Sequence, residues 1–170
     1  MANEHSYLLG GELKRSDDAS YLFKYIILIQ IIIYLEAGAV PALLSTLTEI
    51  FHLSFMLQGA LGGIMYIFIS LACPLASYCF YTFPVREVIG TMLLINGIAT
   101  LAMGLTPQGW AYFLIGARSV IGATQAFIMV FSPVWVDEYS PPNRRTSWLS
   151  YLQASVPCGI MLGRYIYLFM

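Results

Sequence analysis

The sequence predicts an all-α transmembrane protein with about five spanning helices. Three observations support this class: 59% of the residues are hydrophobic, only 10% are charged, and the mean hydropathy is +0.74. A soluble domain carries roughly 25% charged residues, so this chain has too few to cover a globule in water. The net charge of −1 gives no reason to expect a nucleic-acid partner. Membrane lipids are the partners that this composition implies.

A spanning helix needs ~20 mostly apolar residues, and five segments of the chain fit that description. The first, second and fourth are longer than this minimum, which allows a tilt or an extension beyond the bilayer. Residues 1–21 precede them as a polar tail without the apolar core of a signal peptide, so the first helix is expected to remain as an anchor. Residues 22–170 then form a transmembrane domain with helices expected at 22–47, 55–81, 88–105, 110–136 and 148–169.

The connections between these helices indicate the orientation. Lysine and arginine lie before the first helix, between the second and third, and between the fourth and fifth, whereas residues 48–54 and 106–109 contain neither. Because basic loops stay in the cytosol, we expect a cytosolic N-terminus and an integral, multi-pass protein. The connection after the fourth helix carries a charged cluster, expected to be solvated with local ion pairs. These cytosolic residues are Lys14, Arg15, Lys24, Arg86, Asp137, Glu138, Arg144 and Arg145.

Two charged residues lie deep inside apolar segments, Glu36 in the first and Arg118 in the fourth. With a rise of 1.5 Å per residue, Glu36 lies ~18 Å beyond Lys24, at the cytosolic edge, and Arg118 ~12 Å inward from Trp110, at the outer edge. In a core ~30 Å thick, these depths agree. An ionisable residue inside the bilayer is costly and marks a functional site by default. We therefore expect Glu36 and Arg118 to contact each other directly or through one water.

Such a pair admits two interpretations. It can line a polar cavity and couple protonation to a conformational change, because a carboxylate that leaves its guanidinium takes up a proton more readily. Alternatively, it is a structural pair that only fixes the packing of two helices. Gln125 follows Arg118 by seven residues on the same helix face and would extend the polar track toward the cytosol. Polar residues such as this one are otherwise expected to hydrogen-bond between helices.

The sequence offers no cofactor or metal site. The three cysteines lie in apolar segments without histidine or cysteine companions at ligand spacing. No Ser/His, Cys/His or paired-carboxylate set occurs at membrane depth, so we do not expect an enzyme.

Small residues predict close contacts between helices. Gly59 and Gly63 are four residues apart in the second helix, and Gly159 and Gly163 in the fifth. This spacing lets backbones approach because hydrogen replaces a side chain at the contact. Pro157 removes an amide donor from the fifth helix and is expected to kink it. We expect packing from these residues, with a gating role as the alternative.

These features resemble the major facilitator superfamily. The fourth helix reads Arg118-Ser-Val-Ile-Gly122, and the fifth reads Ser155-Val-Pro157-Cys-Gly159-Ile-Met-Leu-Gly163, which are similar to motifs of that family. The segment Glu36-Ala-Gly38-Ala-Val-Pro41 and the later Asp137-Glu138-Tyr139 look like the Spinster branch. The chain departs from the pattern in three places: the aspartate between helices two and three is absent, Glu36-Ala37 stands where the first helix of the branch normally shows Asp-Arg, and Gln125 stands where the branch often carries an acid.

The resemblance implies the fold and the function. The chain would be the first five helices of an N-terminal helical half, C-terminally truncated, and thus a fragment of a secondary transporter. The branch implies proton-linked transport, with Glu36 and Arg118 as coupling residues and a small solute or a lysolipid-type lipid as substrate. The alternative is a non-transporting membrane protein that binds a partner or lipid with the same helices.

The polar tail contains a candidate sorting signal. Glu4 precedes the pair Leu8-Leu9 by four residues, which fits an acidic dileucine pattern read by adaptor proteins from an exposed, extended segment. A tail with incidental leucines is the alternative. The pattern and the resemblance favour an endolysosomal or vacuolar membrane, with the plasma membrane as the other possibility.

Overall fold

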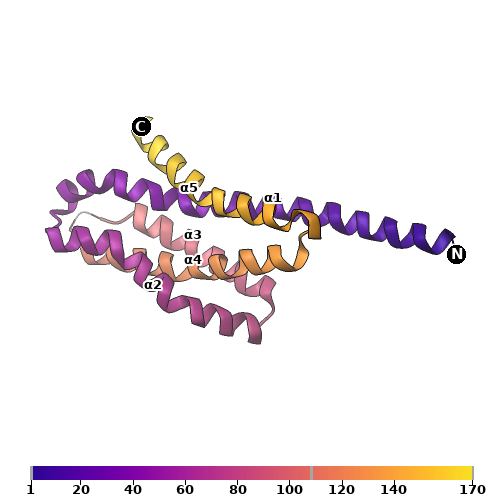
Figure 1. Cartoon of the computed structure of the whole chain (residues 1–170). Helices are drawn as coiled ribbons and strands as arrows, with labels where there is room; N and C mark the ends of the chain where they lie inside the picture. Colours follow the sequence, from indigo (N-terminus) through magenta and orange to yellow (C-terminus); the bar gives the residue numbers. More distant parts are fainter. Residues whose placement is uncertain (1, 108, 170) are drawn as a thin grey trace.

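The computed structural model describes the backbone of residues 2–107 and 109–169, with the side chains of residues 19–107, 109–141 and 143–166. The described chain is entirely helical (Figure 1). This confirms the predicted all-α class. In chain order the elements are α1 (Ala2–Phe51), α2 (Phe55–Thr82), α3 (Val85–Gly104), α4 (Ala111–Tyr139), the short 3₁₀ helix η1 (Pro142–Arg144) and α5 (Arg145–Phe169).

The helices form two groups. Helix α5 packs along α1, while α2 and α3 both pack against α4. Contacts between the two groups are much sparser and come mainly from α1 with α4 and α2 and from α5 with α4. Figure 1 shows α1 and α5 running together along one side of the bundle and the other three helices along the opposite side. The two groups of helices are therefore joined by few contacts, so a polar contact between them forms a notable part of their junction.

Four helices are long and apolar enough to cross a membrane: Ala19–Phe51, Phe55–Thr82, Val85–Gly104 and Ala111–Tyr139. The expected fifth span, in α5, is not among these candidates in the described part of the chain. Its length suffices, but Gln153, Arg164 and several serines and tyrosines lower its hydropathy. The prediction of five helices is thus confirmed, and four of the five are candidate spans by length and composition.

Helix α1 begins at Ala2 and not at residue 22, so the polar residues before the membrane part are helical, while the candidate span begins at Ala19. Residues 12–15, Glu-Leu-Lys-Arg, are good helix formers, and no proline interrupts the segment. Apolar composition marks the part of a helix that lies in the membrane, while the helix itself can continue through polar residues. The other helix ends lie within four residues of their expected positions, which is the usual precision for boundaries expected from sequence.

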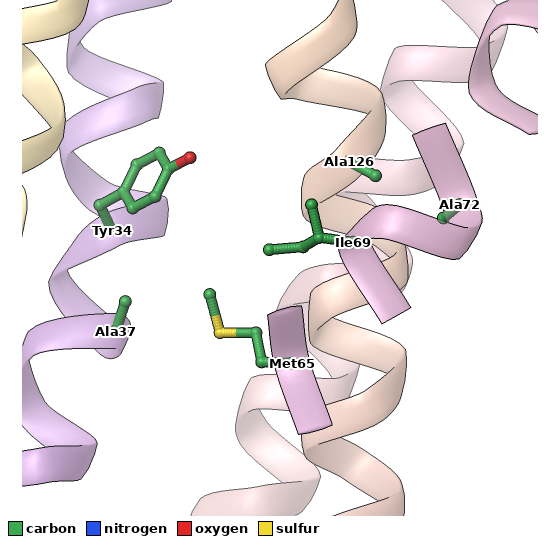
Figure 2. Packing of buried hydrophobic residues seen from close by; sticks show 6 residues of the cluster. All are labelled: Tyr34, Ala37, Met65, Ile69, Ala72 and Ala126. Carbon is green, nitrogen blue, oxygen red and sulfur yellow. The ribbon is translucent and has the colours of Figure 1, made fainter. Parts of the chain in front are cut away.

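The bundle has two ends with different chemistry. We call the end formed by the α2–α3 and α4–α5 connections the basic end, because Arg86, Arg144 and Arg145 lie there. Phe23 of α1 stacks on Trp148 of α5 at this end, with ring centroids 4.2 Å apart. Near the middle, side chains of α1 face those of α2 and α4 across the space between the two groups (Figure 2). This central cluster consists of Tyr34, Ala37, Met65, Ile69, Ala72 and Ala126.

The two glycine pairs behave differently. A methyl group at Gly159 would lie 2.7 Å from the carbonyl oxygen of Ile31, and one at Gly163 would collide with the carbonyl oxygen of Leu35. Gly38 makes the reciprocal approach from α1 to the Ile160 carbonyl of α5. Hydrogen at these positions lets the α1 and α5 backbones touch. Close packing by Gly159 and Gly163 is therefore confirmed, and Pro157 lies within α5 with an exposed ring.

Gly59 and Gly63 have no close neighbour from another helix among the described residues. A methyl group at either position would meet nothing within 4 Å there, so the described part of the chain offers no packing partner for this pair. The glycine that serves α2 is Gly122 of α4, where a methyl group would lie 2.5 Å from the Met65 carbonyl oxygen. A spacing of four residues indicates that two glycines lie on the same face of a helix. It does not indicate whether that face packs against another helix.

Candidate functional site

Glu36 and Arg118 form an ion pair between α1 and α4. The Arg118 Nη1 donates to Glu36 Oε1, as the matching depths predict. The Arg118 side chain is 3% exposed and that of Glu36 is 14% exposed, so both charges are shielded from the surroundings. Their contact is confirmed, and it lies on one of the sparse junctions between the two groups of helices.

A second polar link runs beside the ion pair. The Gln125 Nε2 donates to the Ile33 carbonyl oxygen over 3.4 Å, again from α4 to α1. Gln125 is 1% exposed. Gln125 follows Arg118 by two turns in α4, and Ile33 precedes Glu36 in α1, so this link lies nearer the basic end. We call the set Ile33, Glu36, Arg118 and Gln125 the α1–α4 polar contact.

Several buried polar atoms in this region have no hydrogen-bond partner among the described residues. They are Glu36 Oε2, Arg118 Nε, Gln125 Oε1 and, one turn before Ile33 in α1, Gln30 Oε1. Buried polar groups in folded proteins are nearly always hydrogen-bonded. Three acceptors and one donor therefore remain to be satisfied by water, by a proton on the carboxylate or by a polar group of a bound molecule.

Asn96 provides a separate link from α3 to α4. Its Nδ2 donates to Thr124 Oγ1 over 2.9 Å. This agrees with the expectation that polar residues in these helices hydrogen-bond their neighbours. Gln58 instead bonds locally to the Leu53 carbonyl oxygen, and Gln153 is exposed on α5.

The predicted charged cluster lies at the basic end. Arg145 pairs with Asp137, and both side chains are about half exposed. An ion pair in such a position contributes little to stability. Arg86 and Glu138 line a groove at the same end, whereas Arg144 is exposed. The structure thus brings four helix ends together here, but it does not bring these charges to the α1–α4 polar contact.

An aromatic row at the basic end was not predicted. Trp135 of α4 stacks on Trp148 of α5 with centroids 6.4 Å apart, and Trp148 stacks in turn on Phe23 of α1. Tyr139 extends the row beyond Trp135 at 5.3 Å. The row joins the two groups of helices at one end. The sequence does place its two tryptophans near helix ends, but the stacking partners come from three separate helices.

The dileucine segment lies on the backbone of α1, so it is helical and not extended as expected. The side chains of Glu4, Leu8 and Leu9 lie outside the described residues. Among the described residues, no group of three metal-ligating side chains occurs, and the cysteines are free thiols.

Comparison with protein families gives one match. Residues 26–170 match the family described as Major Facilitator Superfamily, a range that covers well over half of the chain. The range contains both residues of the buried ion pair and all helices after α1. A comparison with curated proteins finds no match.

Proposed function

Because the chain belongs to the Major Facilitator Superfamily, a family of membrane transporters and not of enzymes, we propose that it serves proton-linked transport of a small solute or a lysolipid-type lipid. The proposal places Glu36 and Arg118 at the coupling site. One observation carries it: the buried Glu36 carboxylate accepts from Arg118 with its first oxygen, and its second oxygen has no hydrogen-bond partner in the part of the chain that the structure describes. The proposed Spinster-like branch rests on the sequence motifs of the first and fourth helices.

Coupling follows from the chemistry of the pair. A proton on Glu36 would neutralise the carboxylate and remove most of its attraction for Arg118. The guanidinium would then be a buried charge without a counter-ion, which is costly, so α1 and α4 would favour an arrangement that gives Arg118 another partner. Because the contacts between the two groups of helices are sparse, a change at the ion pair can alter how the two groups pack against each other. Gln125 offers its unpaired Oε1 in the same region.

Glu36→Gln is expected to abolish transport driven by a pH gradient. The amide keeps the size of the side chain and a hydrogen-bonding oxygen for Arg118, but it cannot exchange a proton. The full-length protein encoded by the gene is reconstituted in proteoliposomes. The measurement is its uptake of candidate solutes and lysolipids with and without a pH gradient. Glu49→Gln is the matched control, since Glu49 is an exposed glutamate near the other end of α1. Gradient-driven uptake at the wild-type rate in the Glu36→Gln variant would refute the coupling role.

We propose a cytosolic N-terminus on the evidence of the basic connections. A glycosylation acceptor inserted at residue 10 is then expected to stay unmodified in cells, while one inserted in the α3–α4 connection, which lacks Lys and Arg, is expected to be modified. A mobility shift on gels after treatment with a glycosidase reads out both variants. Modification at residue 10 would reverse the orientation.

We also propose that the segment with Glu4, Leu8 and Leu9 directs the protein to an endolysosomal or vacuolar membrane. Since α1 includes this segment, adaptor binding would require the helix to open locally. Replacing Leu8 and Leu9 by alanine is expected to move a fluorescent fusion to the plasma membrane. Replacing Leu28, a membrane-exposed leucine of the same helix, serves as the control. An unchanged distribution would leave the leucines without a sorting role.

A further inference from the structure

Buried polar side chains lie along one face of α4, from the ion pair toward the basic end. Arg118, Gln125 and Ser132 are spaced by seven residues, which is about two turns of an α-helix. Each of the three is at most 3% exposed. Val136, one turn after Ser132, packs with residues of α1 and α5, so this face of α4 is turned toward those two helices.

Helices α1 and α5 add one buried polar residue each, Gln30 at 6% and Ser155 at 3% exposure. Each lies seven residues after one ring of the stacked pair Phe23 and Trp148. Because α1 and α5 run side by side in the same direction, Gln30 and Ser155 lie at about the same level. We call the set that leads from the ion pair toward the basic end the buried polar track: Glu36, Arg118, Gln125, Gln30, Ser155 and Ser132.

The track contains more hydrogen-bond acceptors than the described side chains satisfy. Glu36 Oε2, Gln125 Oε1 and Gln30 Oε1 are buried without a partner among the described residues. The hydroxyl groups of Ser132 and Ser155 donate to carbonyl oxygens of their own helices, which leaves their own oxygen atoms able to accept. Buried water satisfies such groups in folded proteins, where each molecule makes about three hydrogen bonds. The track is therefore polar enough to hold a series of water molecules.

The opposite direction from the ion pair is apolar. Val40 of α1 and Leu114 of α4, each one turn beyond the ion pair, pack with Leu61 of α2, and none of the three is more than 4% exposed. All other buried polar side chains of the described residues lie on the basic-end side of the ion pair. Water inside the bundle is thus expected to connect Glu36 with the basic end.

A layer of apolar side chains covers the track at the basic end. Phe23 and Trp148 stack with ring centroids 4.2 Å apart, and each is 6% exposed. Val136 contributes to the same layer from α4. The layer lies one turn from Ser132, so it separates the track from the molecular surface at this end.

We propose that the buried polar track holds a chain of water molecules that carries protons between the basic end and Glu36, an inference that rests on the proposed coupling role of Glu36. A hydronium ion at the basic end gives one proton to the first water, and each water passes one proton to the next. Glu36 Oε2 accepts the last proton, while Arg118, the charged group that contacts Glu36, keeps its own. The route lies between α1, α4 and α5, so the proton does not need the entrance that a substrate uses.

Infrared spectroscopy reads the proton on Glu36 directly. The full-length protein is reconstituted in lipid vesicles at a pH low enough to protonate Glu36, and the carboxyl band of this residue is the one that Glu36→Gln removes. Rapid mixing with heavy water at the same pH then gives the rate at which the Glu36 proton exchanges for deuterium. This rate reports access of water to Glu36 and requires no substrate.

A double variant, Gln30→Leu with Ser155→Ala, should slow the exchange about tenfold, the effect of one hydrogen bond lost from the chain of waters. Gln58→Leu and Ser150→Ala are the matched controls and should leave the rate unchanged. Gln58 bonds locally in α2, and Ser150 is exposed on α5 with the same kind of bond to its own helix. Unchanged far-ultraviolet circular dichroism verifies each fold.

Phe23→Leu should have the opposite effect and quicken the exchange, because it removes one ring from the layer that covers the track. A general loosening of the bundle would quicken exchange in every variant, so it cannot explain a slower rate in the double variant. Ser132→Ala, a smaller change in α4, should also slow the exchange and serves in place of the double variant if that one does not fold.

The outcomes separate the track from the coupling role. Exchange at the wild-type rate or faster in the folded track variants would refute the track and leave Glu36 as a proton acceptor reached by another route. A Glu36 that shows no protonated carboxyl band at any pH would refute the coupling role, and the track with it.

Discussion

Arg118→Leu is expected to lower the free energy of unfolding by about 3–5 kcal/mol, the cost of leaving one charge of a buried pair without its partner. The variant keeps an apolar side chain in α4 but leaves the Glu36 carboxylate without the donor that it has on that helix. The loss should shrink as the pH falls, because a protonated Glu36 is neutral and needs no counter-ion. Unfolding in detergent micelles titrated with a denaturing detergent, followed by circular dichroism, measures this difference.

A double-mutant cycle separates the ion pair from simple packing. Glu36→Gln with Arg118→Leu should be more stable than Arg118→Leu alone, because the buried carboxylate is then gone. Replacing the exposed Arg144 by leucine is the control for the loss of one arginine, and it should change stability by less than about 0.5 kcal/mol. If the two single effects at Glu36 and Arg118 simply add, the pair has no energetic coupling and the proposed switch loses its basis.

The ion pair was predictable from the sequence because the argument needed only the charge of each residue and its depth along an apolar helix. A charge inside an apolar segment is conspicuous, and the depth of each charge follows from the rise per residue. Glu36 and Arg118 were therefore the expected partners of each other, although 82 positions separate them in the sequence. Gln125 was predicted for the same reason, since it follows Arg118 on one helix face.

The faces that meet other helices were less predictable. In a soluble bundle, apolar residues mark the buried side of a helix, but in a membrane helix the lipid-exposed side is apolar too. Gly59 and Gly163 belong to identical spacings in the sequence, and only the structure separates the one that faces open space from the one that touches α1. The start of α1 was missed for a related reason, because composition predicts where the membrane begins and not where the helix begins.

The groove at the basic end lay beyond prediction because its residues come from three helices whose relative rotation the sequence does not state. Arg86 and Glu138 looked like ordinary loop charges next to helix ends. Trp135 lies near the end of its helix in the sequence, but its stacking on Trp148 and its place in the groove wall depend on how α4 turns against α5 and α2.

Gly163→Ala is expected to lower the free energy of unfolding by about 1–3 kcal/mol, the usual cost of inserting a methyl group where no space exists. Its methyl group would meet the Leu35 carbonyl oxygen of α1, and backbone atoms cannot rotate away as a flexible side chain can. Gly38→Ala should have a similar effect, because its methyl group would meet the Ile160 carbonyl from the other side. Both changes act on the pairing of α1 with α5, and the same micelle unfolding experiment measures them.

Gly59→Ala and Gly63→Ala provide the matched controls, since the added methyl group meets nothing within 4 Å. Alanine is a better helix former than glycine by about 1 kcal/mol, so these variants should be neutral or slightly more stable. The opposite signs expected for the same substitution make the comparison decisive. A loss at Gly59 equal to that at Gly163 would mean that α2 packs against a partner there, and a neutral Gly163→Ala would mean that α1 and α5 do not approach as closely as the structure indicates.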